Sequence, residues 1–131
     1  MKNIHKLAAI DIGSNAVRLL ITSIRINKSE TKFKKISLVR VPLRLGEDVF
    51  SKGKISDKKL KKLQKTLKAF KILMQMHEVY IFKAVATSAM REAENSTKII
   101  EDIFKKLNIK IDLISGKKEA LMIANVFLNS M

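Results

Sequence analysis

The chain has 131 residues, of which 47% are hydrophobic, and this suits one globular domain with a real core rather than a disordered segment. It contains no cysteine, which excludes a disulfide framework and thiolate metal sites, and no apolar run reaches the length of a membrane span. The net charge of +15 favours polyanionic partners, although lysines on helix backs are also ordinary solvated surface. We expect a protein of the cytoplasm.

The first informative stretch covers residues 7–21 and reads LAAIDIGSNAVRLLI. An apolar run ends in Asp11, a turn of Gly13, Ser14 and Asn15 follows, and a second apolar run begins, which predicts two strands joined by a tight turn. Backbone N–H groups and small polar side chains at such a turn can bind phosphate oxygens, and a neighbouring carboxylate can hold a divalent metal. The alternative is a hairpin tip that only faces water, because Gly-Ser-Asn is common turn chemistry.

The first third of the chain has the pattern of an antiparallel meander. Apolar runs predict three strands, at residues 6–12, 16–26 and 31–41. The connections between them are short, which favours antiparallel pairing, and Pro42 ends the third strand. Residues 43–55 contain two glycines and are expected to form a loop.

The rest of the chain alternates between helical and strand patterns. Apolar residues at steps of three and four predict a helix with Ser56 as its N-cap, and later runs of apolar residues predict strands. The expected elements are a helix at 56–76, a strand at 79–86, a helical stretch at 89–107 that restarts at Asn95 and Ser96, a strand at 109–114, and a last helix that follows Ser115 and Gly116.

The order β-β-β-α-β-α-β-α predicts an α/β fold with a mixed five-stranded sheet, in which the last two strands run parallel to the first. This is the ribonuclease-H-like arrangement of one half of an actin or sugar-kinase type protein. The carboxyl ends of the first, fourth and fifth strands then share one edge of the sheet, where open α/β sheets bind ligands. Polar residues at 11–15, 87–91 and 115–119 follow these ends, and we expect them to line one cleft.

Four motifs extend over nearly the whole chain: LAAIDIGSNAVRLLI, RLGEDVFSKGKIS, VATSAMREAEN and IDLISGKKEALMI. In this order they resemble the N-terminal domain of the exopolyphosphatase / guanosine pentaphosphate phosphohydrolase (Ppx/GppA) family. The D-x-G-S motif alone occurs across the actin-like superfamily, but four motifs in register are more specific. The resemblance implies a hydrolase that releases terminal phosphate from inorganic polyphosphate or guanosine pentaphosphate by metal-assisted attack of water.

The resemblance also implies roles for individual residues. Asp11 would lie at the phosphate-bound Mg²⁺, and Glu119 would act as the general base that orients the attacking water. A guanidinium such as that of Arg91 suits phosphate because its fork can hold two oxygens at once. The implied phosphate-binding residues are Gly13, Ser14, Asn15, Arg18 and Arg91. Judged without the resemblance, Glu119 and Arg91 could equally be ordinary surface residues.

The second phosphate loop of the family, D-x-G-G-G-S, is missing, because the chain has only four glycines and no two are adjacent. We therefore expect residues 1–131 to be one ribonuclease-H-like domain of a two-domain phosphatase whose second domain is absent. Such a domain would have little activity alone and could self-associate through its exposed domain interface. Two alternatives stay open: a non-catalytic polyanion-binding or dimerising module, and half of an actin-like ATPase or sugar kinase.

Overall fold

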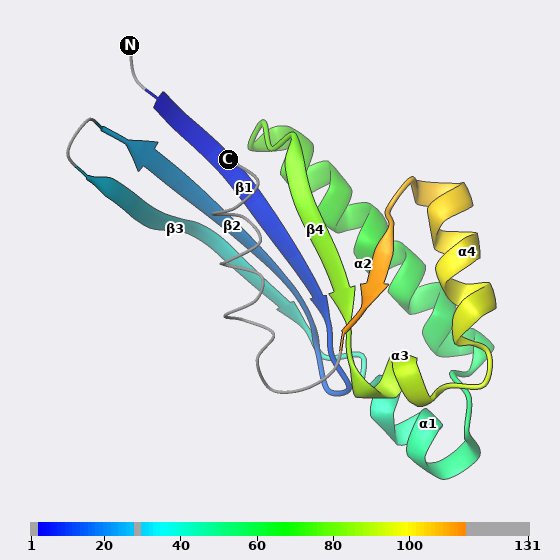
Figure 1. Cartoon of the computed structure of the whole chain (residues 1–131). Coiled ribbons are helices and arrows are strands. Elements are labelled where there is room, and N and C mark those ends of the chain that lie inside the picture. The colour runs from blue at the N-terminus through cyan, green and yellow to red at the C-terminus, as the bar shows by residue number, and fades with distance from the viewer. Residues whose placement is uncertain (1–2, 28–29, 115–131) are drawn as a thin grey trace.

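The structure is a computed structural model that describes residues 3–27 and 30–114. In chain order its elements are β1 (Asn3–Ile12), β2 (Val17–Ile26), β3 (Thr31–Val41), α1 (Leu45–Lys52), α2 (Asp57–Met76), β4 (Ile81–Ala86), α3 (Ser88–Glu92), α4 (Ser96–Leu107) and β5 (Ile111–Leu113). The strands form one sheet, and α2 and α4 lie along the same face of it (Figure 1). The expected last helix and Glu119 lie outside the described residues.

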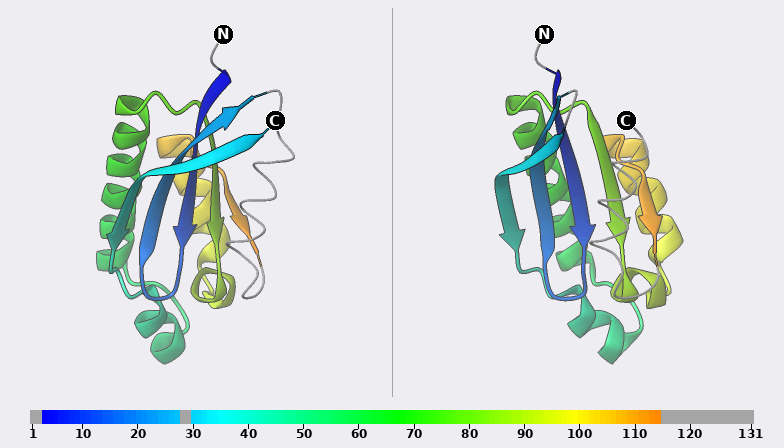
Figure 2. Two further views of the ribbon diagram at one scale, coloured as in Figure 1. Left: turned by 90° about the vertical axis from the view of Figure 1, so that its left-hand side faces the viewer. Right: turned by 60° about the vertical axis from the view of Figure 1, so that its left-hand side comes forward.

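The sheet has the mixed topology that the sequence predicts. Its five strands lie in the order β3-β2-β1-β4-β5. β2 is antiparallel to both β1 and β3, whereas β4 is parallel to β1 and β5 is parallel to β4. The carboxyl ends of β1, β4 and β5 therefore meet at one end of the sheet, next to the short helices α1 and α3 (Figure 2).

The core lies between the sheet and its two long helices. Alternate residues of β1 and β2, such as Ile10 and Leu19, are fully buried against Leu67 and Phe70 of α2 and Ile103 of α4. Burying a side chain of this size contributes about 1.5–3 kcal/mol, so this apolar layer is what holds the helices on the sheet. None of the helices in the described ranges is long and apolar enough to cross a membrane.

The expectation of a loop at 43–55 is wrong over Leu45–Lys52, which forms α1. Leu45 and Val49 lie one helical turn apart and are both buried. The two glycines favour a loop by composition, but Gly53 is a helix C-cap: its φ is 80° and its N–H donates to the Val49 carbonyl at 2.8 Å. A short helix with a glycine at its end is difficult to distinguish from a loop by composition.

The helical stretch at 89–107 is divided into α3 and α4, and the predicted restart at Asn95 is confirmed. The Asn95 side chain does not cap α4. Instead, its Oδ1 accepts from the Ile55 N–H at 3.2 Å and its Nδ2 donates to the Ile55 carbonyl at 3.0 Å. This pair of bonds joins the α1–α2 connection to the α3–α4 connection. β4 and β5 are shorter than predicted, beginning at Ile81 and covering Ile111–Leu113.

Asp48 of α1 is bonded to the beginning of α2. Its Oδ2 accepts from the Ser56 N–H at 2.9 Å, and its Oδ1 lies 3.2 Å from the Lys59 ammonium. The hydrogen bonds from Ser56, assisted by Lys59, lower the pKa of Asp48 from 3.8 to about 2. Ser56 also caps α2, since its Oγ accepts from the Lys59 N–H at 3.3 Å. The Asp48 side chain of α1 and the first turn of α2 thus stabilise each other.

Replacing Asp48 by Asn should destabilise the fold by about 1–2 kcal/mol at neutral pH, because it removes the charge of a hydrogen-bonded carboxylate. The pKa of this carboxyl is lower in the folded state than in the unfolded chain. Its stabilisation is therefore complete above about pH 4 and is lost as the pH falls towards 2. Urea unfolding of both proteins at pH 7, 5 and 3 should show the difference between them becoming smaller at the lowest pH.

Asp102→Asn is the matched control, since no hydrogen bond or ion pair of the Asp102 side chain is recorded within the described residues. We expect its effect on the free energy of unfolding to stay within about 0.5 kcal/mol. A difference between wild type and Asp48→Asn that does not change with pH would contradict the role of the charge.

Candidate functional site

A hollow of about 260 Å³ opens at the carboxyl end of β1. The β1–β2 hairpin supplies most of its lining, and β3 supplies one further side chain. The lining residues are Asp11, Gly13, Ser14, Asn15, Ala16, Arg18 and Arg40. The structure thus brings together all the site residues that the sequence predicts in the first motif.

The turn between β1 and β2 contains backbone N–H groups that are not used by the described hydrogen bonds. A hydrogen bond of 3.0 Å from the Gly13 N–H to the Ala16 carbonyl closes the turn. Across the ranges that the structure describes, no backbone hydrogen bond is recorded for the N–H groups of Ser14, Asn15 and Ala16. Successive free N–H groups in a turn form an anion-binding concavity. The hairpin tip therefore has the chemistry that phosphate oxygens require.

Helix α1 holds this turn from outside the hollow. The Arg44 N–H donates to the Asn15 carbonyl at 2.9 Å, and the Gly46 N–H donates to the Ser14 carbonyl at 2.8 Å. A Cβ atom at Gly46 would lie only 3.1 Å from the Cβ of Ser14, so a glycine permits this close approach. The sequence does not predict α1, so this support for the turn is also unpredicted. Its only signal in the sequence is the segment RLGED.

Asp11 is buried, with 9% of its surface exposed, and its Oδ2 is ion-paired with the guanidinium of Arg18 on β2. Its Oδ1 is buried and has no hydrogen-bond partner among the described residues. An unsatisfied buried oxygen of this kind is costly, so it points to a missing ligand.

Magnesium fits this oxygen. Mg²⁺ is commonly held by one or two carboxylates together with water and substrate phosphates. The described residues contain no cluster of three or more acidic, histidine or cysteine side chains that could hold a metal. Of the described residues, Asp11 alone would then supply a carboxylate to Mg²⁺, with phosphate and water among the remaining ligands.

The Ser14 side chain joins the turn to α3. Its Oγ lies 2.9 Å from the Ser88 Oγ and accepts from the Ala89 N–H at 3.2 Å. A further bond, from the Thr87 N–H to the Ile12 carbonyl at 3.2 Å, holds the two segments together. The hydroxyl of Ser14 is thus already engaged, and its backbone N–H is the group left for a ligand.

Arg91 lies on α3 at the same end of the sheet but does not line the hollow. It is exposed, its Nη1 donates to the Ile114 carbonyl at 3.2 Å, and its Nε lies 3.7 Å from the Glu92 carboxylate. Two of the three guanidinium nitrogens are thus already engaged within the described residues. Glu119 is outside the described residues, so its place relative to the hollow is not part of the geometry.

Arg40 lines the hollow, although the sequence analysis did not single it out. It lies on β3 directly opposite Arg18 of β2. To predict Arg40 as a site residue, one would need to know which residues of β2 and β3 pair with each other. This pairing register shifts between Ile21 and Thr22, which strand lengths alone do not reveal.

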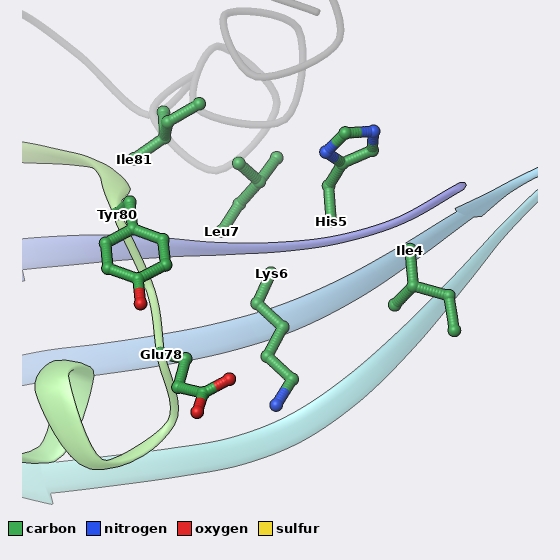
Figure 3. Close-up of a pocket in the computed structure, with 7 residues that line it drawn as sticks. All are labelled: Ile4, His5, Lys6, Leu7, Glu78, Tyr80 and Ile81. Atoms are coloured by element: carbon green, nitrogen blue, oxygen red, sulfur yellow. The ribbon is translucent and has the colours of Figure 1, made fainter. Parts of the chain in front are cut away.

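A second hollow, of about 270 Å³, lies at the opposite end of β1 and β4. Its lining side chains come from both faces of β1: His5 and Leu7 point to one side, and Lys6 points to the other (Figure 3). Tyr80 at its edge is 87% exposed. Because its polar groups do not converge on one point, this hollow has no arrangement that indicates chemistry.

Comparison with known proteins identifies the family of the chain. Residues 24–131 match the Ppx/GppA phosphatase family. The bifunctional 3-dehydroquinate synthase/phosphatase of Fusobacterium nucleatum is 33% identical over 122 residues, which are 91% of this chain and 18% of that protein. Exopolyphosphatase 1 of Mycobacterium tuberculosis is 30% identical over 88% of this chain and 33% of its own length.

Solved structures give the same result. The Ppx/GppA family member of Aquifex aeolicus has a TM-score of 0.80 and 30% identity, covering 88% of this chain and 37% of its own. An exopolyphosphatase from Cytophaga hutchinsonii has a TM-score of 0.78 and 31% identity, covering 88% of this chain and 36% of its own. The chain thus spans between about a fifth and just over a third of these proteins. It belongs to the Ppx/GppA phosphatase family.

Proposed function

We propose that this chain supplies the first phosphate-binding wall of a phosphohydrolase that releases terminal phosphate from inorganic polyphosphate or guanosine pentaphosphate. The hollow at the end of β1 carries the proposal. Within the described part of the chain it combines backbone N–H groups with no recorded hydrogen bond, a carboxylate oxygen without a partner and two arginines. Membership of a phosphatase family, with exopolyphosphatases among the relatives, supports the same class of substrate.

The hollow would act mainly by placing positive charge where the phosphate chain is negative. The N–H groups of Ser14 and Asn15 would bind oxygens of the terminal phosphate. They are preorganised, because α1 and α3 already hold the turn. Donors fixed before substrate arrives need not reorganise during the reaction, which makes them effective in stabilising developing charge.

Asp11 would hold Mg²⁺ through its free Oδ1, while its Oδ2 stays paired with Arg18. When bound, Mg²⁺ would neutralise phosphate charge and lower the barrier to attack by water. Arg18 keeps the Asp11 carboxylate oriented and also presents its exposed guanidinium to the hollow.

We further propose Glu119 as the general base and Arg91 as a second phosphate contact, both on the basis of the family resemblance. Because the chain spans little more than a third of its matched relatives, we propose that a second domain completes the cleft. The two walls would then enclose the terminal phosphate between them, and the isolated chain would bind phosphate but release little of it.

Asp11→Asn should remove the effect of Mg²⁺ on binding of tripolyphosphate. In the wild type, Mg²⁺ should tighten binding at least tenfold, whereas in the variant it should have almost no effect, because an amide is a poor Mg²⁺ ligand. Without Mg²⁺, the variant should bind no more weakly than the wild type, since Arg18 loses its internal partner. Calorimetric titration with and without Mg²⁺ measures both effects.

Asp57→Asn is the matched control, because Asp57 is an exposed acid at the beginning of α2, away from the hollow. It should respond to Mg²⁺ like the wild type. An Asp11→Asn variant that keeps the full Mg²⁺ effect would contradict the metal role of Asp11.

A second test concerns Glu119. Joined to the second domain of a relative such as Mycobacterium tuberculosis exopolyphosphatase 1, the chain should release phosphate from long-chain polyphosphate. Glu119→Gln should lower kcat by about 10²–10⁴-fold, the usual contribution of a general base. Glu101→Gln, at an exposed position of α4, should leave kcat unchanged.

Two results would count against the proposal. An unchanged kcat in Glu119→Gln would exclude Glu119 as the base. Rapid phosphate release by the 131-residue chain alone would show that no second domain is needed.

A further inference from the structure

Three charged side chains form a row across the sheet at the hollow. Asp11 of β1 pairs with Arg18 of β2, and Arg18 pairs with Arg40 of β3. Directly paired residues on neighbouring strands point to the same face, and all three residues line the hollow. Since adjacent strands lie about 4.8 Å apart, the row extends roughly 10 Å from β1 to β3.

The charge of this row is unbalanced. Asp11 is ion-paired with Arg18, but no ion pair or side-chain hydrogen bond of Arg40 is recorded within the described residues. Like charges directly opposite each other destabilise a sheet. The two arginines and one aspartate leave the row with a net positive charge, which a bound anion would neutralise.

A β-bulge places Arg40 in this row. Ile21 pairs with Ser37 but Thr22 pairs with Lys35, so Ile36 is an extra residue in β3. Bulges of this kind redirect side chains and are frequent beside active sites.

Without the bulge, the register in which Thr22–Ile26 of β2 pair with Thr31–Lys35 of β3 would continue as far as the hollow. Val39 would then lie opposite Arg18, and Arg40 would point to the face that α2 covers. In the structure Val39 packs against the core on that face, and Arg40 points into the hollow. The bulge thus determines which of two neighbouring residues faces a ligand.

We propose that Arg40 binds the phosphate next to the terminal one, so that the hollow selects a phosphoanhydride chain over orthophosphate. This inference rests on the proposed function, in which the terminal phosphate binds at the N–H groups of Ser14 and Asn15. The hollow, of about 260 Å³, has room for more than a single phosphate ion. Arg40 lies two strands away from Asp11, so its guanidinium is a second cationic group beside the hollow, apart from the turn.

The test compares Arg40→Gln with the wild type by calorimetric titration at low salt. The dissociation constant for tripolyphosphate should rise about tenfold, since one charge-assisted contact is lost. The constant for orthophosphate should change less than about twofold. Guanosine triphosphate, which offers the same kind of phosphate chain, should show the same loss as tripolyphosphate, and Arg40→Lys should lie between the two proteins.

Arg25→Gln is the matched control. Arg25 lies on β2. Like Arg40, it is exposed and lies opposite a cation, here Lys32, but it does not line the hollow. Its loss should leave the affinity for tripolyphosphate unchanged. Melting temperatures with and without tripolyphosphate give a second readout. Without ligand, Arg40→Gln should be at least as stable as the wild type, and tripolyphosphate should raise its melting temperature less.

Each outcome decides between the two proposals. If the wild type binds tripolyphosphate and Arg40→Gln binds it equally well, the role of Arg40 is wrong and the proposed function stands. Equal losses for orthophosphate and tripolyphosphate would also overturn the inference, because Arg40 would then contact the terminal phosphate. If the wild type binds neither ligand, the proposed function itself fails.

Discussion

The hydrogen bond from the Gly13 N–H to the Ala16 carbonyl is the constraint on which the site depends. It closes the β1–β2 turn and thereby sets the register that pairs Asp11 with Arg18. It also directs the carbonyls of Ser14 and Asn15 to α1, which leaves their N–H groups for a ligand. If this turn were one residue longer or shorter, the strand pairing could slip by one residue, and the side chains of the slipped strand would then lie on the opposite face of the sheet.

The site is organised before any ligand binds, and this organisation has a stability cost. Among the described residues, the Oδ1 of Asp11 is buried without a hydrogen-bond partner, and no acidic side chain is recorded as an ion-pair partner of Arg40, which stands opposite Arg18. The compensation comes from elsewhere, chiefly from the apolar layer between the sheet and α2 and from the contacts that hold α1. A fold whose core is secure can keep such unfavourable groups where function needs them.

The sequence predicts the fold well, because the apolar periodicity of the strands and of α2 is strong and the connections in the meander are short. It also predicts which residues of the first motif gather at the end of β1. α1 was missed because its glycine C-cap has the composition of a loop, and Arg40 was missed because its position depends on a bulge. Gly53 and Ile36 show that the missed features arise from backbone geometry and tertiary contacts, which periodicity does not record.

The bulge in β3 also affects how relatives are compared. A relative with the same number of residues in β3 but no bulge would present the counterpart of Val39 at the hollow, even if it kept an arginine at the next position. An alignment that matched the two arginines by similarity would then assign the wrong residue to the site. For this strand, equivalent positions are those that pair with the same residue of β2, so the hydrogen-bond register is the proper basis for alignment.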